Sequence, residues 1–468
     1  MAYAVRVLSL EAQGLWRDEV DILNFSTAPW LDLLARLTRP GENGPLYLLI
    51  MRGWIALTGE SVFALRFFSL LFGVLGVALI YRLGCRVVGR RGAAWAAVLA
   101  AFSPYFVWYA EEVKMYTWVP FLVLLALYVL DRACARPRWG WWAVVVVATS
   151  FAFYSHILAA LLIPVEILWF LLHPRRDRRA WRGGLLALAL LTLPYLPLLK
   201  WQAGLAFTTR QTGFPDYTFG QMAQMLLGGW STGITGWGLT AGAAIFGGFA
   251  AGGLGALVWQ RKWRTACALL AWVVVPLVSI WVVSLRGPIF TDRYLIWAAP
   301  AFYFAIATAL AFLEQRLQGV ALVCFAVLLT FSGGNLYYQV ATPVKPQFRE
   351  AAAFLAQRRD PEALLLFQIP YNRIVVDYYL SPPLEPWAEA PYTNWPAENG
   401  GYLWNSAEVD AAMQSLTTGY RQLWLVYSEA GMWDERELVK TWLDTHMVLR
   451  ESMGFHNVGL YRYELPAP

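Results

Sequence analysis

Acidic and basic side chains that could act on a substrate lie in a few short segments of an otherwise apolar chain. The first segment, LWRDEVDI, carries Arg17 followed by the adjacent carboxylates Asp18 and Glu19. A carboxylate can take a proton from a hydroxyl group as a general base, or it can bind a divalent metal. Acidic residues at the start of a helix are also stabilised by the helix dipole. This pair alone therefore fits either a chemical or a structural role.

The second segment, SPYFVWYAEEVKMYTW, places Glu111, Glu112 and Lys114 among aromatic residues between two apolar runs. A turn between two membrane helices needs only a few polar residues. Two carboxylates and a lysine exceed that need, and ionisable groups at a membrane edge often mark a site. We interpret this segment as a second acidic site, which could also hold a metal.

Two further segments carry basic or titratable side chains. RGPIFTDRYL contains Arg286, Asp292 and Arg293, and the planar guanidinium group suits phosphate. FYSHIL places His156 between two apolar runs, where a hydrogen-bonded structural histidine is the more common case and a functional role, at the second acidic or metal site with Glu111 and Glu112, is the alternative. Taken together, the segments could bind a phosphate group and remove a proton from a hydroxyl group.

The composition places these segments in a membrane protein. Of 468 residues, 58% are hydrophobic and 15% are charged, whereas soluble proteins have about 45–50% and about 25%. The low charge and high hydrophobicity also exclude a disordered chain. The net charge of +6 comes from short basic clusters between apolar runs, which orient membrane helices and argue against a nucleic-acid partner. The four cysteines lack metal-ligand spacing.

About ten apolar runs can be distinguished as candidate membrane helices, some of them shorter than the ~20 residues that a span needs. They cover approximately residues 67–81, 92–107, 115–130, 139–154, 157–172, 183–199, 237–259, 265–285, 294–313 and 319–338. Most basic residues of the short loops fall in one alternate set, which the positive-inside rule places in the cytoplasm. This set includes Arg82, Arg86, Arg90, Arg91, Arg175, Arg176, Arg178, Arg179, Arg261, Lys262 and Arg264.

The predicted fold is an all-α polytopic membrane bundle with a small extracytoplasmic α/β domain. The membrane domain covers 1–338, with outer loops at 1–66 and 200–236, and the soluble domain covers 339–468. In the latter, 348–359 and 433–444 have helical patterns, whereas 363–369, 422–427 and 457–464 resemble strands. An outer N-terminal segment needs a preceding helix to carry it across, so we expect an eleventh span upstream of this sequence.

The carboxylates and cations are thus predicted to lie at helix ends on one side of the membrane. Carboxylates there can deprotonate a hydroxyl group, and cations can neutralise a departing phosphate. This combination favours transfer from a lipid-linked phosphate donor at the outer face. A transporter is the rival interpretation, but it would place ionisable groups near the midplane and often shows internal repeats. No repeat is visible here.

Several segments together resemble the GT-C membrane glycosyltransferases, and most of all glycosyltransferase family 39, which includes protein O-mannosyltransferases and aminoarabinose transferases. They are LWRDE, NGPLYLLIMRGWIALTGESVFALRFFSLLFGVLGVALIYRLG, SPYFVWYAEEVKMYTW, FYSHIL, FTDRYLIWAAP and KPQFREAAAFLAQ. Their order and spacing carry the resemblance over nearly the whole chain. The resemblance implies a polytopic helical bundle with interfacial helices in its first outer loop, in the plasma membrane.

The resemblance also implies an inverting transfer of a sugar from a polyprenyl-phosphate donor to a lipid, glycan or protein acceptor. The family's catalytic aspartate matches Asp18, with Glu19 beside it, and its second acidic position matches Glu111 or Glu112. The cations that hold the lipid phosphate match Lys114 and Arg293, and more weakly Arg17 and Arg286. A polymerase or ligase of lipid-linked glycans shares this donor and topology and stays open as an alternative.

Two departures from the family pattern bear on these assignments. Where many members have His-Pro-Pro before Leu-Tyr, this chain has Asn43-Gly44-Pro45, so contacts with the donor or acceptor there can differ. The family's first membrane helix, which precedes the acidic pair, is absent from this sequence, in agreement with the expected eleventh span. The sequence identifies no certain cofactor, and a divalent metal is the one candidate.

Overall fold

The computed structural model describes residues 1–37, 39, 42, 45–207, 214–236, 238–397 and 401–466. It contains two compact units. The helical unit comprises Met1–Leu10 and Phe25–Ala341, and the C-terminal unit comprises Glu11–Asn24 and Thr342–Pro468. Asn43, Gly44 and Arg210 lie outside the described residues.

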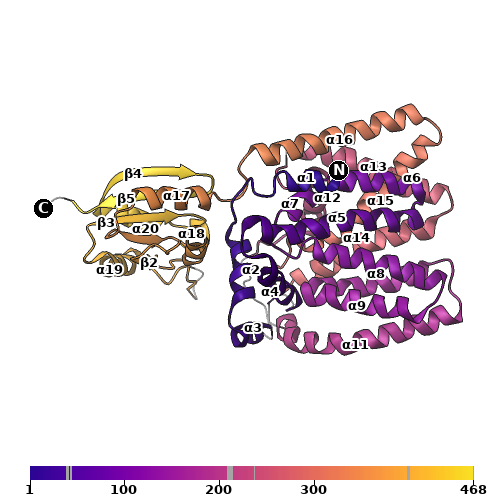
Figure 1. The fold of residues 1–468 in the computed structure, drawn as a ribbon, viewed down its shortest axis with the longest axis horizontal. Coiled ribbons are helices and arrows are strands. Elements are labelled where there is room, and N and C mark those ends of the chain that lie inside the picture. Colours follow the sequence, from indigo (N-terminus) through magenta and orange to yellow (C-terminus); the bar gives the residue numbers. More distant parts are fainter. Residues whose placement is uncertain are drawn as a thin grey trace. The chain divides into compact units, whose positions relative to one another are not determined.

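The helical unit is built from α-helices joined by short connections (Figure 1). Helices α8 and α9 pack side by side, as do α9 and α11, α5 and α6, α13 and α15, and α10 and α14. The helices are α1 (Ala2–Val7), α3 (Trp30–Leu37), α4 (Leu46–Thr58), α5 (Val62–Val87), α6 (Gly89–Ala101), α7 (Pro104–Ala110), α8 (Trp118–Ala135), α9 (Trp139–Ser155), α10 (Leu162–Leu172), α11 (Arg178–Phe207), α12 (Phe219–Thr232), α13 (Leu239–Trp259), α14 (Trp263–Ser284), α15 (Ala299–Glu314) and α16 (Gln318–Ala341), with 3₁₀ segments η1 (Ile157–Leu161) and η2 (Asp292–Ala298).

Six helices of the described residues are long and apolar enough to cross a membrane, and the bent pair α6–α7 would make a seventh. The polytopic helical bundle predicted from the sequence is therefore confirmed. The other predicted runs fall on the shorter apolar helices α9 and η1–α10 and on α11. The number of ten or eleven spans stays a prediction.

A sharp bend between α6 and α7 shapes the centre of the helical unit. The two helix axes differ by 58° across the break at Phe102 and Ser103. Pro104 follows, and proline lacks the N–H that a continuing helix requires while disfavouring helical geometry in the residue before it. Ser103 caps the new helix, because its hydroxyl accepts a hydrogen bond from the Phe106 N–H at 3.2 Å. The chain after α7 is consequently turned into the protein interior.

Two of the predicted outer loops contain helices. Residues 1–66 hold α1, α3 and α4 together with α2 (Arg17–Thr27), and residues 200–207 continue α11. The predicted outer loop 200–236 also includes α12. This helix begins with a capping box, in which the side chains of Thr218 and Gln221 each accept a hydrogen bond from the other residue's backbone N–H. The described parts of these two segments therefore contribute helices to the fold.

The C-terminal unit contains a five-stranded mixed sheet with strand order β2-β1-β3-β5-β4. Strand β1 (Leu364–Phe367) runs parallel to β2 (Trp387–Glu389) and β3 (Gln422–Tyr427), whereas β5 (Val458–Glu464) is antiparallel to β3 and β4 (Val448–Phe455). Helices of this unit are α17 (Phe348–Arg358), α18 (Arg373–Tyr379), α19 (Ser406–Thr417) and α20 (Leu438–His446), with short 3₁₀ turns at Pro370–Asn372 and Ala430–Met432. The predicted α/β fold is confirmed.

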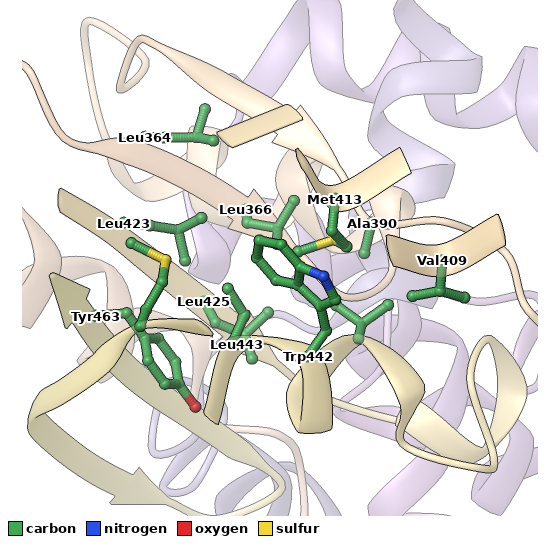
Figure 2. Packing of buried hydrophobic residues seen from close by; sticks show 12 residues of the cluster. Leu364, Leu366, Ala390, Val409, Met413, Leu423, Leu425, Trp442, Leu443 and Tyr463 are labelled. Carbon is green, nitrogen blue, oxygen red and sulfur yellow. The ribbon is translucent and has the colours of Figure 1, made fainter. Parts of the chain in front are cut away.

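The core of this unit lies between the sheet and helices α19 and α20 (Figure 2). Leu366 and Leu425 from the central strands meet Met413 of α19 and Trp442 of α20 there. The Trp442 indole N–H donates a hydrogen bond to Asp410 at 2.6 Å, so the polar edge of this large ring is satisfied while its body is buried. The unit thus has a hydrophobic core of its own.

Candidate functional site

The segment that follows α7 is buried although it carries two carboxylates. Glu111 and Glu112 are 9% and 1% exposed. Glu111 accepts a hydrogen bond from the Ser9 hydroxyl at 2.5 Å, and the guanidinium group of Arg6 adds an attractive charge. Arg6 itself donates to the carbonyl oxygens of Ala2 and Ala101, each at 3.0 Å. Glu111 is therefore engaged with the N-terminal helix.

Glu112 belongs to a different group of side chains. The phenol of Tyr109 interacts electrostatically with Glu112, Asp292 and Arg293. We call these four residues the polar cluster. Asp292 and Arg293 are the first residues of η2, far along the chain. The two adjacent carboxylates that the sequence left interchangeable thus differ in these interactions, since Glu111 is hydrogen-bonded to Ser9 and Glu112 interacts with the tyrosine that also interacts with Arg293.

Arg293 lies against an aromatic ring. Its guanidinium carbon lies 5.8 Å from the centre of the Tyr116 ring, within the range of a cation–π interaction. His156 contacts the rings of Tyr116 and Tyr294, with centroids 6.4 and 4.8 Å away. Burial and the charge of Arg293 lower the pKa of His156 to about 3, so its imidazole is neutral. The neutral imidazole therefore adds no positive charge to that of Arg293.

His156 has an unusual environment for a buried polar ring. Neither of its nitrogens has a hydrogen-bond partner in the described part of the chain, although the side chain is only 2% exposed. Buried polar groups are normally hydrogen-bonded. The described residues therefore do not provide the hydrogen bond expected of an ordinary structural histidine at this position.

Asp292, Tyr105 and Tyr109 are candidate site residues to which the prediction from the sequence assigned no role. The Tyr105 ring lies 4.9 Å from that of Tyr109, and its hydroxyl group interacts electrostatically with the Asp292 carboxylate. Gly229 of α12 permits this approach, since a Cβ atom there would lie 3.2 Å from the Tyr105 ring and 3.4 Å from Asp292. The SPYFVWYAEE and TDRYL segments contained these residues, but only the fold shows that they meet.

The other predicted cations lie outside the polar cluster as defined. Lys114 is half-buried in the segment after α7, where its backbone carbonyl accepts a hydrogen bond from Ser69 at 3.3 Å. Arg286 is exposed just beyond the end of α14. Arg293 and Lys114 are both half-buried, and Arg293 is the one that interacts with Tyr109 and the Tyr116 ring.

The acidic pair Asp18 and Glu19 lies in the first turn of α2, where the helix dipole stabilises both negative charges. The two side chains differ in environment. Glu19 is fully buried and forms an ion pair with Lys345 at 3.1 Å. Asp18 is half-buried, and its neighbour Arg17 pairs with Glu429 at 3.3 Å. Glu19 is therefore the structural member of the pair, and Asp18 is the more accessible one.

Further contacts tie the segment before α2 to the C-terminal unit. The Gln13 side-chain oxygen accepts hydrogen bonds from the backbone N–H groups of Val344 and Lys345 at 2.9 and 2.8 Å. The Tyr379 hydroxyl accepts from the Leu15 N–H at 2.5 Å. Arg349 donates to the carbonyl oxygens of Glu11 and Ala12, each at 3.2 Å. We call this set, together with the Glu19–Lys345 pair, the clamp.

We expect Lys345→Met to lower the stability of the full chain. Removing one partner of a buried ion pair leaves the other charge uncompensated, which typically costs about 3 kcal/mol. Thermal unfolding in detergent measures the change, and the double variant Lys345→Met/Glu19→Gln should recover part of it because the buried charge is gone. Unfolding of Lys345→Met at the wild-type temperature would show that the pair contributes nothing to the clamp.

The structure gives no support to the predicted metal site. Within the described ranges, no three His, Cys, Asp or Glu side chains gather closely enough to hold a metal ion. In particular, Glu111, Glu112 and His156 do not form such a group, because Glu111 is engaged with Ser9 and Arg6 whereas His156 packs on tyrosine rings. We therefore derive no step through a metal.

Comparison with known proteins adds a family match and a fold. Residues 40–201 match the family described as dolichyl-phosphate-mannose-protein mannosyltransferase. The structure of ArnT from Cupriavidus metallidurans in the apo state is similar over 98% of this chain and 96% of that chain, with a TM-score of 0.63 and 14% identity. The chain has the GT-C fold. The resemblance to GT-C membrane glycosyltransferases predicted from the sequence is confirmed at this level.

Two other GT-C proteins share the fold over most of this chain. The oligosaccharyltransferase AglB of Archaeoglobus fulgidus, in complex with an inhibitory peptide and a dolichol-phosphate, matches 90% of this chain and 66% of its own, with a TM-score of 0.52 and 11% identity. The mycobacterial arabinofuranosyltransferase AftD matches 100% of this chain and 41% of its own, with a TM-score of 0.52 and 16% identity. No curated protein matches the sequence significantly.

Proposed function

We propose that this GT-C protein is an inverting glycosyltransferase that moves a sugar from a polyprenyl-phosphate donor to an acceptor hydroxyl group at the outer face of the cytoplasmic membrane. The observation that carries the proposal is Arg293, a half-buried cation that lies against the Tyr116 ring and interacts with Tyr109, within a GT-C fold. The family match to a lipid-phosphate-dependent mannosyltransferase supports the donor class. ArnT with the same fold has been solved bound to undecaprenyl phosphate.

The phosphate of the donor is assigned to Arg293, with Lys114 as a second cation and Arg286 and Arg17 as weaker candidates. Negative charge builds up on the phosphate as the sugar–phosphate bond breaks. A preorganised cation in an enclosed site stabilises that charge strongly, because little water competes with it. Tyr109 and Tyr116 provide a partly apolar wall around Arg293. This arrangement suits a phosphate group on a lipid chain.

The base is assigned to Asp18. An acceptor hydroxyl group must lose its proton as it attacks the anomeric carbon, and one carboxylate on the face opposite the phosphate is sufficient for inversion. Glycosidases differ, since two carboxylates share the acid and base roles there. Asp18 is the less buried carboxylate of its pair, and the clamp fixes the segment that carries it. Glu19 holds that segment rather than acting as the base.

Glu112 is assigned as the second acidic site residue in preference to Glu111. The Glu112 carboxylate interacts electrostatically with Tyr109, as do Asp292 and Arg293. Glu111, in contrast, accepts a hydrogen bond from Ser9. We infer that Glu112 and Asp292 orient Arg293 and contact hydroxyl groups of the sugar. A polymerase or ligase of lipid-linked glycans would use the same cations, and it differs in the size of the donor glycan.

Release of polyprenyl phosphate tests the proposal directly. The full chain, purified and reconstituted in lipid, is incubated with polyprenyl-phosphate monosaccharides and a membrane extract that supplies the acceptor. Stoichiometric appearance of polyprenyl phosphate and of a glycosylated acceptor with inverted anomeric configuration is expected. Consumption of a donor with retained configuration would contradict the mechanism, and turnover only with a polyprenyl-linked oligosaccharide would favour the polymerase or ligase.

The topology behind this proposal also yields a prediction. Basic residues are concentrated in one set of alternate loops, so residues from 339 onward should be extracytoplasmic and the Arg178 loop cytoplasmic. Reporter fusions at Gln347 and at Arg178 should therefore give opposite signals in a paired periplasmic and cytoplasmic reporter assay. The same signal from both positions would contradict the topology and with it the outer location of the site.

A further inference from the structure

A large polar cavity lies at the end of the helical unit where the arginine-rich loops gather. Its volume is about 730 Å³, and it is bordered by the C-terminal ends of α5, α8 and α10, by the loop after α10 and by the N-terminal end of α14. Glu112 of the polar cluster lies just before the start of α8, whereas the cavity includes Asp131 near the end of α8. Because α8 has 18 residues, its two ends lie about 27 Å apart. The cavity is thus separate from the candidate site.

Cations dominate the lining of the cavity. Arg86, Arg175, Arg261, Lys262 and Arg264 all border it. These five side chains come from three separate parts of the chain that meet only in the fold. Exposed basic loops alone serve as topology signals. Here, however, the basic residues border one partly open cavity that is large enough for a phosphate-bearing headgroup.

The acidic residue of the cavity is already neutralised. Asp131 forms an ion pair with Arg86, and the Nε2 atom of His173 lies 3.3 Å from the other carboxylate oxygen. The ring orientation of His173 is fixed on its opposite side, where Nδ1 contacts the Arg175 carbonyl oxygen at 2.8 Å. The Asp131 carboxylate is consequently paired with side chains of the cavity wall, so the remaining cations give the cavity a net positive charge.

The start of α14 adds to this positive potential. Its first residues, Trp263 and Arg264, border the cavity, and the helix has 22 residues. The N-terminal end of a helix carries partial positive charge and unpaired backbone N–H groups, which favour an anion. Trp169 and Trp263 form apolar parts of the wall. Tryptophan is enriched where lipid headgroups meet acyl chains.

From these features we infer that the cavity binds the phosphate group of an anionic ligand, with a phospholipid headgroup as the source that best fits a cationic pocket between membrane helices. Basic pockets between transmembrane helices on the cytoplasmic side are suited to anionic headgroups. The tryptophan walls would contact the first part of the acyl chains. This binding site is independent of the proposed transfer reaction.

Native mass spectrometry of the full chain, released from detergent with defined lipids, tests the inference. Phosphatidylglycerol is titrated against phosphatidylcholine, and inorganic phosphate is tested separately by its effect on thermal unfolding. The variant Arg261→Gln/Arg264→Gln removes two lining charges. The matched control Arg90→Gln/Arg91→Gln removes two exposed charges in the first turn of α6, which does not border the cavity. Thermal unfolding verifies that both variants fold.

We expect one phosphatidylglycerol to be retained per chain, with affinity lowered roughly tenfold or more by the cavity variant and unchanged in the control, since each basic residue near an anionic surface contributes about 1 kcal/mol. If inorganic phosphate, but no lipid, stabilises the wild-type chain and this effect is lost in the cavity variant, the cavity binds phosphate and its ligand is a soluble molecule. Equal effects of the two variants, or no preference for phosphatidylglycerol over phosphatidylcholine together with no stabilisation by inorganic phosphate, would overturn the inference.

Discussion

Asp18→Asn should reduce sugar transfer by about two to four decades while leaving donor affinity nearly unchanged. The substitution is close to isosteric but cannot accept the proton of the acceptor hydroxyl group, and general-base catalysis typically contributes ~10²–10⁴-fold. Turnover at saturating polyprenyl-phosphate sugar measures the loss, and donor binding is measured separately. Because Asp18 is half-buried at the start of α2, we expect the variant to fold.

Neighbouring carboxylates provide the controls for this assignment. Glu19→Gln should reduce turnover less than Asp18→Asn, because Glu19 is buried against Lys345 and acts by holding the segment. Glu111→Gln should act mainly on stability through Ser9 and Arg6. Near wild-type turnover of Asp18→Asn, together with loss of turnover in Glu112→Gln, would move the base to the segment after α7 and refute the assignment.

Arg293→Ala should lower turnover by about two to three decades. The guanidinium group is proposed to neutralise the leaving phosphate, and one such contact typically contributes ~2.7–4 kcal/mol to the transition state, or about a decade for each 1.4 kcal/mol. The Tyr116 ring, which lies against the Arg293 guanidinium group, stays in place in the variant and fills part of the volume that the arginine side chain leaves. Turnover and thermal unfolding of the same preparation separate a chemical defect from a folding defect.

Two further arginine variants make this second prediction sharper. Arg293→Lys keeps the charge but loses the planar pair of donors that suits phosphate, so we expect an intermediate loss. Arg286→Ala removes an exposed arginine of the same segment and should cost less than Arg293→Ala. Normal turnover of Arg293→Ala, or equal losses in Arg286→Ala and Arg293→Ala, would show that Arg293 does not hold the phosphate.

The sequence predicted the fold well where periodicity and hydropathy decide it. The expected helix at 348–359 and the strands at 363–369, 422–427 and 457–464 correspond to α17, β1, β3 and β5. Strand β4 was missed because it lies at the edge of the sheet and is mostly exposed, so its sequence VLRESMGF lacks a buried face. The expected helix at 433–444 begins later, at Leu438, because Asp434 accepts hydrogen bonds from the N–H groups of Leu438 and Val439.

The candidate site was predictable only in part. The segments that carry Glu112 and Arg293 stood out because charges are rare in apolar runs. Their meeting around Tyr109 depends on the bend at Pro104 and on η2, which place residues together that are nearly two hundred positions apart. Spacing alone could therefore not distinguish Glu111 from Glu112.

The clamp lay beyond sequence reasoning for a similar reason. Glu19 finds its buried partner Lys345 more than three hundred residues away, and neither residue has a local pattern that identifies the other. The sequence predicted one outer loop over 1–66, whereas Glu11–Asn24 packs with the C-terminal unit. Long-range ion pairs of this kind follow from the tertiary fold and leave no periodic signal in the chain.

Mass spectrometry of the lipid-linked sugars in a deletion strain tests the central claim most directly. Loss of this chain should cause one polyprenyl-phosphate monosaccharide to accumulate while one glycosylated product disappears, and the wild-type chain should restore both whereas Asp18→Asn should restore neither. An unchanged pool of polyprenyl-phosphate sugars in the deletion strain, or accumulation of a polyprenyl-linked oligosaccharide in its place, would contradict the account.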